Sequence, residues 1–76
     1  MESITEWMDM VCSSLLTKPC TEEELFNRDF IKNIADYWKH KILQWLETDG
    51  KIYYKGNVIH VYKKTIKELE KKGYYD

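Results

Sequence analysis

The chain has 76 residues, of which 43% are hydrophobic, 14% aromatic and 33% charged, and its formal net charge is −1. One small domain over 1–76 is expected at this length, and three Trp, six Tyr and two Phe supply the large core side chains that disordered chains lack. No segment is long and apolar enough to span a membrane, and the N-terminus lacks the basic and apolar regions of a secretory signal, so a cytoplasmic location is expected.

Charge is distributed unevenly along the chain. Residues 1–30 carry two basic and seven acidic side chains, whereas residues 31–76 carry ten lysines and six acids. Such an uneven charge distribution is typical of a protein with a surface that binds a polyanion. The alternative explanation is that the lysines only solubilise a small aromatic-rich domain. The single arginine, Arg28, argues against base reading by several guanidinium groups.

The first expected helix covers residues 3–16. Apolar residues recur there at intervals of three and four, and acids occupy the first turns, where the helix dipole favours them. Pro19 interrupts the pattern. Thr21 and Glu24 then have the spacing of a capping box, which predicts a short helix over 22–26.

The longest apolar pattern predicts a helix over 29–47, with Asn27 as a suitable N-cap. At about 100° per residue, two tryptophans and three isoleucines fall on one stripe, which we expect to form the core face. Lys32, Lys39 and His40 fall on the opposite side, which we expect to face solvent. The stripe consists of Ile31, Ile34, Ala35, Trp38, Ile42, Trp45 and Leu46.

A β-hairpin is expected over 51–62. A two-residue turn at Gly56 and Asn57 pairs Tyr54 with Ile59, so that one face of the hairpin is apolar and lies on the helices. The outward face then carries Lys51, Tyr53, His60 and Tyr62.

The last expected helix covers 65–72. Thr65 and Glu68 have the spacing of a second capping box, and Gly73 is placed to cap the end of the helix. Glu68 and Lys72 are four residues apart, which predicts an ion pair along the helix surface. The whole pattern predicts an α+β fold with three to four helices and one two-stranded antiparallel hairpin.

This order of elements is that of a small winged-helix domain. The segment from His40 to Gly73 reads HKILQWLETDGKIYYKGNVIHVYKKTIKELEKKG. It resembles the C-terminal half of small winged-helix proteins of the excisionase and phage-regulator type. In those proteins, a helix leads through a short polar turn into a hairpin with a Gly-Asn tip and then a closing helix. The resemblance lies in this pattern and in no diagnostic motif, and it covers about half of the chain.

The resemblance implies a DNA-binding regulator or accessory factor, with one helix in the major groove and the hairpin wing on the DNA backbone or in the minor groove. Arg28 and Lys32, at the start of the long helix, are the best candidates for contacts to the groove or to phosphates, although Asp36 reduces the positive charge on the exposed face of this helix. The overall acidity predicts weak binding, or binding as a dimer or beside a partner protein. The candidate nucleic-acid-binding residues are Arg28, Lys32, Lys39, Lys51, Lys55, Asn57, Lys63 and Lys64.

The alternative function is a non-enzymatic protein-interaction module, such as a phage or mobile-element protein that binds and modulates a host protein. The acidic N-terminal half would suit a basic partner. Tyr53 and Tyr62, predicted to point outward on the hairpin, are interface candidates. Met10 and Leu43 fall outside the apolar stripes, where they would suit a homodimer contact.

The sequence gives no reason to expect an enzyme, a cofactor or a metal site. His40 and His60 lack a recognisable carboxylate or thiol partner, so neither is expected to act as a general base or a metal ligand. Cys12 and Cys20 have no metal-site spacing and are expected to be free thiols in a cytosolic chain.

Overall fold

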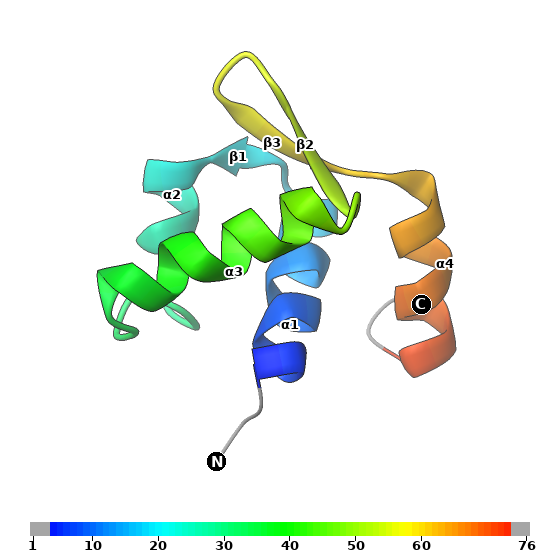
Figure 1. Cartoon of the computed structure of the whole chain (residues 1–76), viewed down its shortest axis with the longest axis horizontal. Coiled ribbons are helices and arrows are strands. Elements are labelled where there is room, and N and C mark those ends of the chain that lie inside the picture. The colour runs from blue at the N-terminus through cyan, green and yellow to red at the C-terminus, as the bar shows by residue number, and fades with distance from the viewer. Residues whose placement is uncertain (1–3, 74–76) are drawn as a thin grey trace.

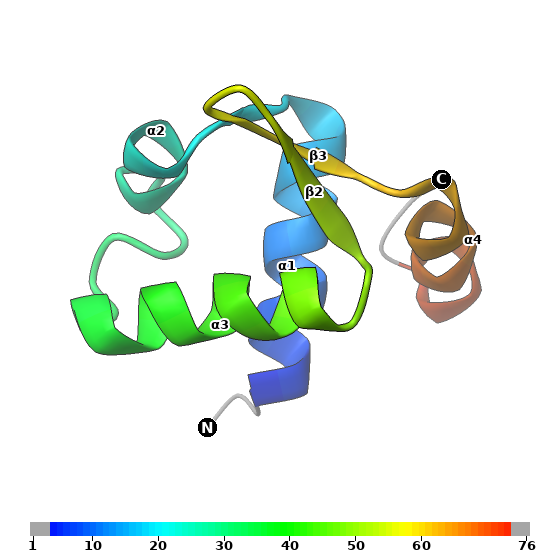
Figure 2. The same cartoon turned by 45° about the horizontal axis from the view of Figure 1, so that its top comes forward.

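A computed structural model describes residues 4–73 and contains, over that range, four helices and a three-stranded antiparallel sheet (Figures 1 and 2). This architecture confirms the predicted α+β class, with one strand more than expected. The elements in chain order are α1 (Ile4–Thr17), β1 (Cys20–Thr21), α2 (Glu22–Phe26), α3 (Asp36–Thr48), β2 (Ile52–Lys55), β3 (Val58–Val61) and α4 (Lys63–Lys72).

The hairpin of β2 and β3 has the predicted register. Tyr54 pairs with Ile59 and Ile52 with Val61, as a two-residue turn at the tip requires. Gly56 in this turn has a φ of 63°, a left-handed conformation that glycine adopts without steric cost. We call this hairpin the wing.

Strand β1 corrects the prediction of a two-stranded sheet. Cys20 pairs with Ile59 and Thr21 with Val58, so β3 becomes the central strand and the order is β1-β3-β2. A strand of two residues is too short to show an alternating apolar pattern, so periodicity could not predict it.

Helix α1 packs at the centre of the fold. It contacts β3, α3 and α4, while α3 crosses it and also contacts β2 (Figure 1). The buried apolar side chains are Val11, Cys12, Leu15, Cys20, Leu25, Ile31, Ile42, Leu43, Leu46, Ile52, Ile59 and Leu69.

The predictions for several helix ends are confirmed. The Thr21 hydroxyl accepts a hydrogen bond from the Glu24 backbone N–H at 3.3 Å, and the Glu24 carboxylate accepts one from the Thr21 N–H at 3.2 Å, which completes the capping box. Gly73, with a φ of 84°, caps α4. Helix α1 ends one residue later than predicted, and its expected first residue lies outside the described residues.

The long helix is shorter than predicted. It begins at Asp36, and residues 27–35 form turns instead of its first two helical turns. Asn27 is the C-cap of α2 and not the N-cap of a new helix. The Arg28 guanidinium donates hydrogen bonds to the backbone carbonyls of Ser14 and Lys18, and these bonds tie the turn segment to the end of α1. Tertiary contacts therefore override the helical pattern of this segment.

The buried face of α3 is rotated by about 70° from the predicted stripe. Leu43, expected at the surface, is 4% exposed, whereas Trp38 and Trp45, expected in the core, are 46% and 37% exposed. Ile42 and Leu46 belong to both the predicted and the observed stripe, so the periodicity alone could not decide between the two faces. Burial also removes Leu43 from the candidates for a homodimer contact.

Lys39 is buried on this face, contrary to its predicted exposure. Its side chain is only 8% exposed, and the ammonium donates a hydrogen bond to the Lys32 carbonyl at 3.1 Å. The Asp36 carboxylate lies 3.6 Å from the same ammonium, and the Phe26 ring centroid lies 5.6 Å away. These partners compensate the charge for its lost hydration.

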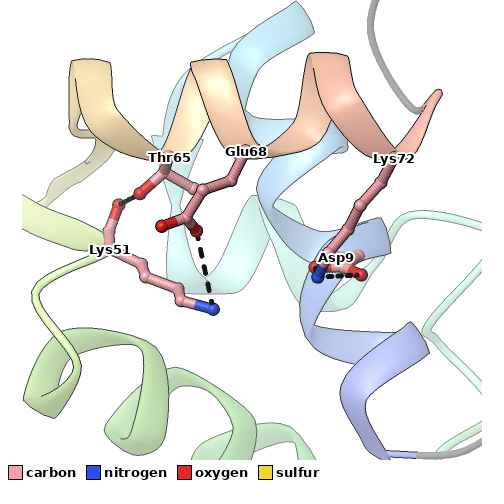
Figure 3. A network of polar contacts seen from close by, with 5 residues as sticks. All are labelled: Asp9, Lys51, Thr65, Glu68 and Lys72. Carbon is pink, nitrogen blue, oxygen red and sulfur yellow. Dashed lines mark hydrogen bonds and ion pairs between the residues drawn. The ribbon is translucent and has the colours of Figure 1, made fainter.

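Helix α4 begins at Lys63 without the predicted second capping box. Thr65 is buried, and its hydroxyl donates to the Lys51 backbone carbonyl at 3.2 Å (Figure 3). The ammonium of Lys51 lies 3.9 Å from the Glu68 carboxylate, and that of Lys72 lies 3.1 Å from Asp9 of α1. The predicted Glu68–Lys72 pair is thus replaced by two pairs that attach α4 to the rest of the fold.

Candidate nucleic-acid interface

The outward side of α3 carries a line of polar residues. Lys41, Gln44 and Thr48 follow one another at intervals of three and four, opposite the buried side of the helix. Gln44 and Thr48 are exposed, and the Lys41 ammonium lies over the Tyr37 ring, 5.6 Å from its centroid. None of these three residues is among the candidates predicted from the sequence, although all three lie off the predicted apolar stripe as well.

One flank of α3 is aromatic. Tyr37, Trp38 and Trp45 are exposed and touch in series, with ring centroids 5.4 Å apart for the first pair and 6.4 Å for the second. We call these three residues the aromatic strip. His40, on the other flank, contacts the Phe26 ring of α2 edge-on at 5.1 Å. The strip therefore lies on the side of α3 away from α2.

The wing extends beyond the helices (Figure 1). Lys55 and Asn57 at its tip are exposed, as are Lys63 and Lys64 where the chain leaves β3 and enters α4. The Lys64 ammonium lies near the C-terminal end of α3, 3.2 Å from where a Cβ on Gly50 would be. A positive charge at this position is favoured by the negative end of the α3 dipole.

Four of the predicted DNA-contacting residues already have partners within the protein. Arg28 holds the end of α1, Lys32 pairs with Asp29 at 3.1 Å, and Lys39 is buried. Lys51 is largely covered and points toward Glu68, so it does not share the outward face of the wing as expected. The other four candidates are exposed and lie at the two ends of β3, with Lys55 and Asn57 at the wing tip and Lys63 and Lys64 at the start of α4.

The outward face of the wing carries the predicted aromatic residues. Tyr53 lies opposite His60 with ring centroids 5.3 Å apart, and it contacts the Tyr62 ring at 4.7 Å. Both tyrosines are exposed, as predicted for interface candidates. Met10, the remaining interface candidate, is half-buried on α1.

An acidic groove lies on the other side of the wing. It has a volume of about 380 Å³ and is lined by Thr21, Glu22, Glu23, Tyr54 and Asn57. The Tyr54 hydroxyl donates to the Glu22 carboxylate at 2.7 Å, and burial together with this bond raises the pKa of Tyr54. Because the groove is acidic, a polyanion would approach the wing from its lysine-bearing side.

The described residues 4–73 include no group of three or more His, Cys, Asp or Glu side chains placed to hold a metal ion. Cys12 and Cys20 are buried and free. Burial raises the pKa of the Cys12 thiol to about 12, so this thiol is a poor nucleophile near neutral pH. Within the same range, no helix is long and apolar enough to cross a membrane.

Comparisons of the chain with protein-family models, curated proteins and solved structures find no match.

Proposed function

We propose that this protein is a small DNA-binding regulator or accessory factor, with the outward side of α3 in the major groove and the wing on the phosphate backbone. The observation that carries the proposal is a continuous basic segment. Residues 50–67 contain five lysines and no acid, and they form the wing and the start of α4. Lys51 points toward Glu68, and the other four, Lys55, Lys63, Lys64 and Lys67, are exposed. Lysine contacts to phosphates provide most of the affinity of small DNA-binding domains.

The outward side of α3 supplies side chains that suit base edges. Gln44 matches the donor and acceptor pattern of adenine, and Lys41 can donate to guanine. A helix of 13 residues is about 20 Å long, and the diameter of an α-helix, about 10–12 Å with its side chains, matches the width of a major groove, about 12 Å. The acids on α3 lie at its two ends, at Asp36 and Glu47, and they reduce affinity without blocking the middle of the helix.

The proposal is tested by fluorescence anisotropy with a labelled AT-rich duplex. If three lysines neutralise phosphates, the salt slope is about −2.7, and affinity falls roughly 40-fold between about 50 and about 200 mM salt. Lys55→Ala or Lys63→Ala should reduce the slope by about one. Lys71→Ala is the matched control, because Lys71 is equally exposed but lies at the far end of α4.

Two outcomes would contradict the DNA proposal: no binding at about 50 mM salt, or equal effects of the Lys55 and Lys71 variants.

The proposal includes a cytoplasmic location, where thiols stay reduced, and the two free cysteines are in keeping with it.

The aromatic strip favours a second candidate function, that of a protein-interaction module. Exposed Trp and Tyr are the residues most enriched at interface hot spots, and three in contact exceed the scattered exposure of ordinary surfaces. The partner to test first is a second copy of the chain. Light scattering should then show concentration-dependent dimers that Trp38→Gln abolishes, and a monomer at all concentrations would contradict self-association.

A further inference from the structure

The outward face of the wing holds three aromatic rings, of which the Tyr53 ring contacts the other two. Tyr53 of β2 contacts His60 of β3 and Tyr62, which follows β3. The ring centroids are 5.3 Å apart for the first pair and 4.7 Å for the second. Tyr53 and Tyr62 remain 37% and 43% exposed although their rings contact each other at a tilt of 45°. We call Tyr53, His60 and Tyr62 the ring cluster.

The register of the hairpin places these rings outward. Ile52 and Ile59 are buried under the wing, so their neighbours Tyr53 and His60, which pair directly, are on the opposite face. The backbone N–H of Tyr62 donates to the Lys51 carbonyl at 3.1 Å, which extends the ladder and brings its ring diagonal to Tyr53. Regular strand pairing therefore holds the cluster in place.

Two exposed lysines adjoin the ring cluster along the chain. Lys55 follows Tyr53 by two residues on the same face of β2, and Lys63 directly follows Tyr62. Both lysines are exposed, and neither is in an ion pair among the described residues. Strands β2 and β3 contain no acidic residue. A ligand on this face would meet flat aromatic surfaces next to ammonium groups.

We propose that the ring cluster binds single-stranded nucleic acid, with unpaired bases stacked on Tyr53 and Tyr62 and the adjoining phosphates against Lys55 and Lys63. Single-strand binding combines these two elements, since every base offers an aromatic face and every nucleotide a negative charge. In a duplex the base faces are stacked on each other, so the exposed rings could not reach them. Single-strand binding by the ring cluster does not depend on duplex binding, because α3 takes no part in contacts to the single strand.

The experiment compares two probes, a fluorescein-labelled oligothymidine and an oligouridine of the same length, about 15 nucleotides, near the upper site size of one small domain. Anisotropy is measured at about 50 mM salt. The wild-type protein should bind at least one of them. Binding of only the deoxy strand would assign the site to DNA, and binding of only the ribo strand would assign it to RNA.

The variants separate stacking from charge. Tyr53→Val keeps a residue suited to strands but removes the ring, and it should weaken binding roughly five- to hundredfold. Tyr53→Phe is the matched control and should stay within about twofold of the wild type, because the aromatic face remains. Tyr62→Val tests the second ring if the Tyr53→Val protein does not fold, as judged by circular dichroism.

Two results would overturn the inference. One is the absence of binding to both single strands, and the other is wild-type affinity in folded Tyr53→Val or Tyr62→Val protein. Gln44→Ala on α3 distinguishes this inference from the duplex proposal. It should leave single-strand binding unchanged and affect only duplex binding, so either activity can fail while the other remains.

Discussion

The ion pair between Asp9 and Lys72 joins the two ends of the described chain, and removing it should measurably destabilise the fold. The Lys72 ammonium lies 3.1 and 3.3 Å from the two carboxylate oxygens of Asp9 (Figure 3). The Asp9 side chain is 11% exposed and that of Lys72 is 44% exposed. Lys72→Met keeps the length of the side chain and leaves a nearly buried carboxylate without this partner.

The magnitude follows from the burial of the pair. Breaking a fully buried pair costs about 3–5 kcal/mol, and a surface pair is worth about 0–1 kcal/mol. Water reaches this pair through the half-exposed lysine, so we expect a loss of about 1–2 kcal/mol in the free energy of unfolding. For a domain of this size, that corresponds to a fall of about 4–16 °C in Tm.

Urea denaturation followed by circular dichroism measures this loss, and Lys71→Met is the control. Lys71 is the exposed neighbour of Lys72, and its substitution should change stability by less than about 0.5 kcal/mol. A double-mutant cycle with Asp9→Asn should give a coupling of about 1 kcal/mol, whereas a cycle of Lys72 with Glu68 should give almost none. Equal stability of Lys72→Met and the control, or stronger coupling of Lys72 to Glu68 than to Asp9, would contradict a stabilising Asp9–Lys72 pair.

Three further predictions address the other corrections and the capping box. Arg28→Lys should lower stability by about 1–2 kcal/mol, because an ammonium cannot bridge two carbonyls as the guanidinium does, and it should leave duplex affinity unchanged. Leu43→Ala should cost about 2–4 kcal/mol and Trp45→Gln less than about 1 kcal/mol; the reverse order in urea denaturation would contradict the observed face of α3. Hydrogen bonds from the backbone N–H and hydroxyl of Thr21 hold the pKa of Glu24 below its ordinary value. Because a depressed pKa stabilises the fold only above the pKa of the unfolded state, the stability advantage over Thr21→Val should shrink as pH falls from about 6 to about 3, and a constant difference would argue against this role.

The elements whose determinants are local were predictable from the sequence. The capping box at Thr21 requires only residues three apart, and the wing requires a two-residue turn between alternating strands. The Gly73 cap depends on its own left-handed backbone. Each of these features is formed by residues adjacent or nearly adjacent in the chain, so the local sequence pattern was sufficient to predict it.

The features that only the tertiary structure decided depend on contacts between distant residues. Arg28 ends a helical pattern early by bonding to α1, and Lys72 selects Asp9 over a partner four residues away. The face of α3 was ambiguous because Ile42 and Leu46 lie on both stripes, and packing against the rest of the core buried Leu43 in preference to Trp45. This rotation exposes the aromatic strip of α3, so this surface could be read only from the packed fold. The wing needed no such information, since alternation along two paired strands already separates its buried and exposed faces.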